Sequence, residues 1–132
     1  MIDIGANLGY FSLLWASARL DNRCFSFEAS PRNEEMLRRN VTRNLLDSQI
    51  QIYPVAAGKE YRRMEFDLGP PEQTGWGGFS SGAAAHPVTV AAVRVDQVLD
   101  LPGILYSFRK FYFRDTDELM SEYFKRFPVS NS

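Results

Sequence analysis

The chain contains almost no cysteine or histidine, and this scarcity excludes several kinds of site. Cys24 is the only cysteine among 132 residues, and His86 is the only histidine. A single cysteine excludes a disulfide within the chain and a cluster of thiolate ligands. We therefore expect no metal site, and a reducing compartment is the default expectation.

A long apolar run, a secretory signal and a large net charge are missing as well. No run approaches the ~20 apolar residues that a membrane-spanning helix needs, and the N-terminus lacks the basic-then-apolar layout of a signal peptide. Fifteen basic and sixteen acidic side chains leave a net charge of −1, so no global field attracts nucleic acid or an anionic membrane. These absences predict a cytoplasmic protein by default, with no nucleic-acid or membrane partner in this segment. They leave the oligomeric state open.

The residues that are present suit one folded domain covering residues 1–132. Hydrophobic residues make up 45% of the chain and aromatic residues 14%, which is enough for one core. Residues 1–4 have the pattern of the end of a buried strand, so we also expect a further segment before Met1.

Residues 1–58 follow the order strand, helix, strand, helix, strand. Short apolar segments predict strands at 2–4, 23–27 and 50–55. Such alternation predicts an α/β fold with a doubly wound, Rossmann-like parallel sheet, of which this chain holds an incomplete part.

The two predicted helices cover residues 10–20 and 31–45. Apolar residues recur there at spacings of three and four, and Ser30 with Pro31 forms an N-cap followed by proline in the first turn. We expect the arginines of the second helix, Arg32, Arg38, Arg39 and Arg43, to face solvent. The expected buried faces are Phe11, Leu14, Trp15 and Ala18 in the first helix and Met36, Leu37, Val41 and Leu45 in the second.

After Gly58 the pattern changes. In residues 59–100, the segments 64–68 and 88–95 alternate like strands and predict an added β-hairpin region around the Gly/Pro/Ser-rich loop 69–87. Residues 101–132 form a divergent tail with a predicted C-terminal helix, whose apolar face is Leu119, Met120, Tyr123, Phe124 and Phe127. In this tail the aromatic and basic stretch 108–114 is predicted to dock on the sheet rather than to bind single-stranded nucleic acid.

A glycine-rich turn at residues 5–9 leaves the first predicted strand, where doubly wound folds bind nucleotide-like cofactors. Its spacing, Gly5-x-x-x-Gly9 after Asp3, differs from the Gly-x-Gly-x-x-Gly of dinucleotide binders. S-adenosylmethionine carries no phosphate, and both its ammonium and its ribose diol need acceptors. Asp3 and Glu28 fit these two needs, although an acid in the position of Glu28 also serves nicotinamide cofactors.

Two motifs, IDIGANLGYFS at residues 2–12 and FEASP at residues 27–31, resemble the start of the FkbM-type class I methyltransferases. The resemblance continues through the strand 50–55 and the AAG that follows it. Residues 93–99 (VRVDQVL) resemble the family's next strand and helix start. The resemblance covers about residues 1–100 and is most specific over residues 2–58.

The resemblance implies an S-adenosylmethionine-dependent methyltransferase that acts on a small-molecule acceptor, such as a hydroxyl of a sugar. It also implies that the turn from Asp3 to Gly9 surrounds the methionyl part of the cofactor and that Glu28 holds the ribose. It identifies no catalytic residue. The implied cofactor-binding residues are Asp3, Gly5, Ala6, Asn7, Gly9, Glu28 and Ala29.

The chain departs from the family after Leu99. Family members continue into a strand resembling Ile-Asp-Val-Glu-Gly, whose acid lies beside the cofactor, whereas residues 101–107 (LPGILYS) carry no acid. A truncated, inactive domain that serves as a binding or interaction module, or a gene-model fragment, is therefore an alternative. An NAD(P)-dependent reductase is a further, less favoured alternative.

Three weaker candidates have simpler explanations. Trp76 or Phe79 in the segment 75–81 could cover a pocket, but a flexible loop is the favoured interpretation. His86 could act as a general base, although a single loop histidine before proline is more often a bystander. The sequence Asn-Val-Thr at residues 40–42 matches a glycosylation site, but it falls in a predicted helix and is discounted.

Overall fold

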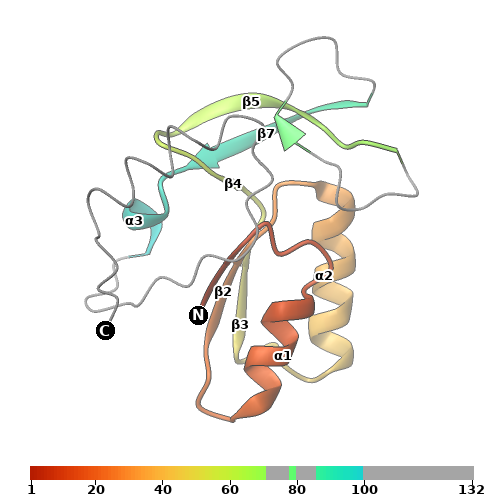
Figure 1. Cartoon of the computed structure of the whole chain (residues 1–132), viewed down its shortest axis with the longest axis vertical. Coiled ribbons are helices and arrows are strands. Elements are labelled where there is room, and N and C mark those ends of the chain that lie inside the picture. Colours follow the sequence, from red (N-terminus) through yellow and green to blue (C-terminus); the bar gives the residue numbers. More distant parts are fainter. Residues whose placement is uncertain (71–77, 80–85, 100–132) are drawn as a thin grey trace, which may run out of the picture.

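The computed structural model describes residues 1–70, 78–79 and 86–99 of the chain. These residues form an α/β structure with two sheets (Figure 1). No helix among them is long and apolar enough to cross a membrane. Trp76, considered above as a pocket cover, and the predicted tail elements, including the C-terminal helix, lie outside the described residues.

The first sheet confirms the predicted order of strands and helices. Its strands β1 (Ile2–Ile4), β2 (Cys24–Phe27) and β3 (Ile50–Tyr53) are parallel and lie side by side in that order. Helices α1 (Tyr10–Ala18) and α2 (Pro31–Arg43) make the two crossovers. The third strand ends two residues before its predicted end.

The strands divide their side chains between two faces of this sheet. Cys24, together with isoleucines of β3, packs against Ala16 of α1 and Leu37 of α2, so both helices cover one face (Figure 1). Ile2 and Phe27 face the other way. Asp3 pairs with Ser26 in the register and so lies on the helix-covered face.

The face that α1 buries differs from the predicted one. Ser12 and Ala16 are buried, whereas Leu14 is 59% exposed and Trp15 is 43% exposed. Ala18 is exposed too. Ser12 is bonded to the sheet by its hydroxyl, and the small Ala16 permits close packing there. Of the other large apolar side chains, Phe11 is half-buried, and Leu13 is half-buried against the core.

In α2 the predicted face is correct only in its middle. Leu37 and Val41 are buried, but Met36 is exposed. Leu45 lies beyond the helix at a φ of 58° and is 85% exposed, and the next residue, Leu46, enters the core in its place. The helix ends before Leu45, so helical periodicity does not apply to this residue. The periodicity therefore predicted burial of Leu45, whereas Leu46 is the buried leucine.

The second sheet has the order β4-β7-β5-β6. Its strands are β4 (Ala56–Ala57), β5 (Arg62–Asp67), β6 (Gly78–Phe79) and β7 (Pro87–Val93). β4 runs parallel to β7, and the other two pairs are antiparallel. The short strand β6 falls inside the segment that the sequence predicts to be a loop.

A third helix, α3 (Val95–Val98), begins where the sequence predicts the last strand to end. Val95 and Leu99 pack with Ile2 and Phe27, so this region covers the face of the first sheet opposite α1 and α2. The second sheet packs its residues Ala56, Phe66, Val90 and Ala92 against Ala29, just beyond the carboxyl end of β2. The carboxyl end of β2 therefore lies beside the second sheet (Figure 1).

Candidate functional site

The predicted glycine-rich turn crosses the carboxyl ends of β1 and β2. The backbone N–H groups of Gly5 and Ala6 both donate to the carbonyl of Phe27, at 2.9 and 3.0 Å. The Asn40 amide of α2 donates to the carbonyl of Leu8 at 2.9 Å. The turn is thus fixed both to the neighbouring strand and to the second helix.

Three residues of this turn have a left-handed backbone. The φ angles are 72° at Gly5, 53° at Asn7 and 88° at Gly9. Gly9 also lacks space, because an added Cβ would lie 2.4 Å from Cδ1 of the buried Leu37. Asparagine tolerates the left-handed region better than most residues, so the sequence Gly-Ala-Asn-Leu-Gly is suited to this path.

Glu28 joins the turn to the start of α2. Its Oε2 accepts a hydrogen bond from the backbone N–H of Asn7 at 2.7 Å, and its Oε1 accepts one from Ser30 at 2.8 Å. The residue is only 5% exposed. Burial raises the pKa of Glu28, the two N–H groups oppose that rise, and the charge of Asp3 adds to it.

Asp3 directs its Oδ2 toward α1. Its Oδ2 accepts a hydrogen bond from the Ser12 hydroxyl at 2.6 Å. Burial raises the pKa of Asp3, and the hydroxyl and backbone N–H of Ser12 oppose that rise. Because Ser12 is the third residue of α1, its backbone N–H is one of those that a helix leaves unpaired at its start, and Asp3 accepts from it.

The predicted alanines have packing partners. Ala6 is buried with the core beneath the two helices, and Ala29 is half-buried against the second sheet. The structure therefore places the predicted cofactor-binding residues together at the carboxyl ends of β1 and β2, with the second sheet packed against Ala29.

One side chain at this end, Arg32, departs from its predicted exposure, and His86 contributes only a backbone contact. Arg32, expected in solvent, is half-buried and donates to the carbonyls of Leu68 at 3.2 Å and Pro70 at 3.4 Å, which links α2 to the end of β5. His86 stands at the start of β7, and its backbone N–H donates to Asp67 Oδ1 at 3.2 Å. Its role as a bystander stays a prediction.

Sequence reasoning missed the buried serines beneath Asp3. Ser12 and Ser26 are both 0% exposed, and their Oγ atoms lie 2.8 Å apart. The available signal was the inward position of Ser26, two residues after the buried Cys24 on the same strand. A hydroxyl at such a position needs a partner in the core.

One polar atom of the turn has no partner among the described residues. The side-chain Oδ1 of Asn7 is buried and accepts no hydrogen bond there. In residues 1–70, 78–79 and 86–99, no three acidic, histidine or cysteine side chains come together as metal ligands. The local chemistry is that of hydrogen-bond acceptors gathered at one end of a sheet.

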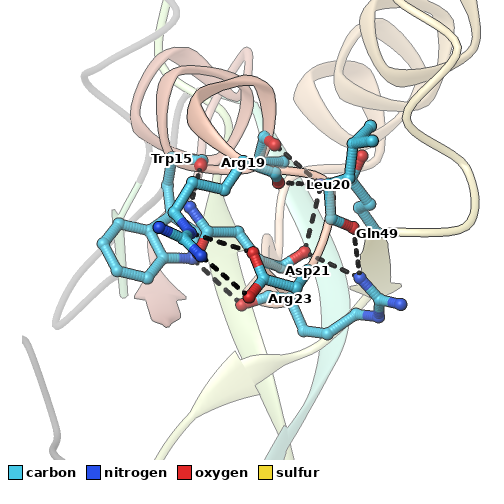
Figure 2. A network of polar contacts seen from close by, with 8 residues as sticks. Trp15, Arg19, Leu20, Asp21, Arg23 and Gln49 are labelled. Atoms are coloured by element: carbon cyan, nitrogen blue, oxygen red, sulfur yellow. Dashed lines mark hydrogen bonds and ion pairs between the residues drawn. The ribbon is translucent and has the colours of Figure 1, made fainter.

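The opposite end of the first sheet is closed by a different network (Figure 2). The Gln49 amide donates to the carbonyls of Ala16 at 2.7 Å, Arg19 at 2.9 Å and Asn22 at 3.1 Å. The Trp15 indole donates to the carbonyl of Arg23 at 3.2 Å. These bonds hold the connection from α1 to β2, and none involves a predicted site residue.

A shallow depression of about 600 Å³ also lies away from the turn, along β2 and β3. Arg23, Arg38 and Asp47 contribute to its lining, and no predicted site residue does. Its charges are mixed, and it is largely open. We therefore identify the candidate site by its turn and its buried acids.

Comparison with known proteins gives a structural match. No protein-family model and no curated protein matches the sequence. Among solved structures, the chain is similar to the methyltransferase FkbM from Methylobacillus flagellatus KT, with 18% sequence identity and a TM-score of 0.49. The match covers 76% of this chain and 22% of that one, so the chain spans about a fifth of that protein's length.

Proposed function

We propose that this chain is the S-adenosylmethionine-binding half of an FkbM-type class I methyltransferase, whose acceptor is a hydroxyl of a sugar or another small metabolite. One observation carries the proposal: a left-handed turn at residues 5–9 stands beside two buried carboxylates, Asp3 and Glu28, at the carboxyl ends of adjacent parallel strands. Ligands of open α/β sheets bind at such ends.

Glu28 suits a ribose diol. Each of its oxygens accepts one backbone N–H, from Asn7 and from Ser30. A carboxylate oxygen can accept two hydrogen bonds, so each retains capacity for one hydroxyl. The two N–H groups also fix the plane of the carboxylate, which favours bidentate binding of two neighbouring hydroxyls.

Asp3 distinguishes this cofactor from a dinucleotide. Dinucleotide folds place a pyrophosphate at the N-terminus of the first helix. Here the Asp3 carboxylate already lies against that terminus through Ser12, and its negative charge repels phosphate. The same charge attracts the ammonium of a methionyl group, and the unpartnered Asn7 Oδ1 also requires a donor.

The chemistry demands little of the protein beyond orientation. When bound, S-adenosylmethionine supplies an activated methyl group for in-line displacement by the acceptor oxygen. The turn and Glu28 hold the ligand in place, which lowers the entropic part of the barrier. No described residue is assigned as the base that removes the hydroxyl proton.

Calorimetric titration with S-adenosylmethionine and S-adenosylhomocysteine tests the proposal. We expect both to bind and NAD and NADP not to bind. Asp3→Asn and Glu28→Gln should each weaken binding at least tenfold, because each removes a charged acceptor. Arg39→Ala, on the exposed side of α2, is the matched control and should leave binding unchanged. The proposal fails if neither ligand binds at millimolar concentration.

The second candidate function is cofactor binding without methyl transfer. It is favoured by the lack of an acid in residues 101–107, where the resembling family has one. A transfer assay with a labelled methyl donor and a panel of hydroxyl-bearing metabolites separates the two. Label in a product supports the enzyme, whereas binding with no labelled product supports the binding module.

A further inference from the structure

A row of four polar side chains crosses the helix-covered face of the first sheet. Cys24 Sγ lies 3.5 Å from Ser26 Oγ, Ser26 Oγ lies 2.8 Å from Ser12 Oγ, and Ser12 Oγ lies 2.6 Å from Asp3 Oδ2. All four residues are buried. We call these residues the donor row.

When Asp3 is ionised, the direction of every bond in the donor row follows from this last member. An ionised carboxylate can only accept, so the single hydroxyl proton of Ser12 goes to Asp3. Ser12 must then accept from Ser26, and Ser26 must accept from the thiol of Cys24. Three consecutive donors thus point toward one carboxylate, and each bond polarises the next.

We propose that Ser12 and Ser26 are positioning residues for Asp3, which keep its carboxylate ionised and assign Oδ2 to the protein, so that Oδ1 receives the ammonium of the ligand. The ligand half of this inference rests on the proposed function. Cys24 terminates the row and supplies its first proton.

Burial makes such support necessary. It raises the pKa of Asp3, and the charged or titratable groups that interact with Asp3 include Glu28 at the end of β2 and Cys24. The charge of Glu28 disfavours a second negative charge beside it, whereas burial raises the pKa of the Cys24 thiol and so favours its neutral, donating form. The Ser12 hydroxyl and backbone N–H favour it, so the ionisation of Asp3 depends on the donor row.

A purely structural role predicts a different design. Apolar side chains would fill the space between β1, β2 and α1 without the desolvation of two hydroxyls and a carboxylate. The fold retains an acid there together with three donors that satisfy it. Retention of a charge in the core at this cost indicates use of that charge.

The experiment compares Ser26→Ala and Cys24→Ala, which break the donor row, with Cys24→Ser, which keeps a donor at its start. The Asp3 carboxyl pKa is measured by carbon NMR on aspartate-labelled protein. The dissociation constant for S-adenosylhomocysteine is measured from pH 5 to pH 8.5. Ser26→Thr restores the hydroxyl and serves as the rescue variant.

We expect Ser26→Ala to raise the Asp3 pKa and to weaken binding about tenfold at the acid end of the range, with a smaller effect toward pH 8.5, because a higher pH favours the ionised carboxylate in every variant. Cys24→Ala should act in the same direction but less, and Cys24→Ser and Ser26→Thr should match the wild type. A merely structural role would lower the melting temperature without moving the pH midpoint of binding.

Each contrary outcome has its own meaning. If the Asp3 pKa is unchanged in Ser26→Ala, the donor row does not keep the Asp3 carboxylate ionised, and the proposal is overturned. If the Asp3 pKa rises but the pH midpoint of S-adenosylhomocysteine binding does not move, the donor row supports only the start of α1. That outcome overturns the positioning role of Ser12 and Ser26. Absence of binding by the wild type contradicts the proposed function and the ligand half of this inference, while the NMR titration still decides whether the row holds the charge.

Discussion

The two ends of the parallel sheet use their polar groups differently. At the amino end, the Gln49 amide is shared among three backbone carbonyls and closes the connection from α1 to β2 (Figure 2). At the carboxyl end, Asp3 and Glu28 are buried acids with raised pKa values, and Asn7 Oδ1 has no partner among the described residues. One end uses its hydrogen-bonding capacity for the fold, and the other retains an unpartnered acceptor, which the proposed function assigns to a ligand.

This difference follows from the geometry of parallel strands. Helix N-termini and glycine-rich turns gather at the carboxyl ends of the strands, and ligands bind there. Connections from helix to strand gather at the amino ends, where they need only be closed. Substitutions at the amino end should therefore affect stability alone, whereas those at the carboxyl end should separate into structural and binding effects.

The largest effect on stability is expected at Gly9, in the turn at the carboxyl end. At this position both the backbone conformation and the packing exclude a side chain. Gly9→Ala forces a side chain into the left-handed region and against Leu37 Cδ1. The strain and the overpacking together should lower the free energy of unfolding by about 3 kcal/mol. Urea denaturation measures this loss.

Leu37→Ala provides the control for that prediction. It removes the atom that the new Cβ would strike, so Gly9→Ala in this background should cost only about 1 to 2 kcal/mol of backbone strain. Equal losses in both backgrounds would show that the clash with Leu37 plays no part.

Gln49→Ala should have the next largest effect. It leaves the carbonyls of Ala16 and Arg19 without their side-chain donor in a buried setting, and we expect a loss of about 2 kcal/mol in unfolding free energy. Gln51→Ala, on an exposed position of β3, is the matched control and should cost less than about 0.5 kcal/mol. If Gln49→Ala also weakened the binding of S-adenosylhomocysteine by an order of magnitude, the separation between the two ends would be wrong.

The smallest effect concerns the pH dependence of stability. A carboxyl whose pKa is higher in the folded state binds its proton more tightly there, so it lowers stability as the pH rises from its unfolded pKa to its folded pKa. Asp3 and Glu28 both shift in this direction. Stability from this source is fully present below the unfolded pKa values and is lost above the folded ones.

Asp3→Asn removes one of the two contributions. The variant should lose less stability than the wild type between pH 4 and pH 7, and at pH 7 it should be at least as stable, because an amide avoids burial of a charge while its oxygen still accepts from Ser12. Urea denaturation at several pH values measures this. A steeper decline in Asp3→Asn than in the wild type would contradict the expected sign.

The elements of the first sheet could be predicted because their signals are local. β1 has its predicted bounds, and the N-cap at Ser30 followed by Pro31 starts α2 as expected. The faces of the helices could not be predicted so well. Periodicity weights large apolar residues, whereas α1 is seated on the sheet by the small residues Ser12 and Ala16.

The sequence by itself determined the order of strands and helices over residues 1–58, the glycine and asparagine turn, and the positions of Asp3 and Glu28 at strand ends, because strand alternation, capping and left-handed backbone depend on neighbouring residues. Only the tertiary structure decided that β1 directs Asp3 toward α1, that Ser26 and Ser12 meet beneath it, and that the second sheet packs beside Glu28 at Ala29. These contacts join residues far apart in the chain, and their geometry is set by packing that no local pattern encodes.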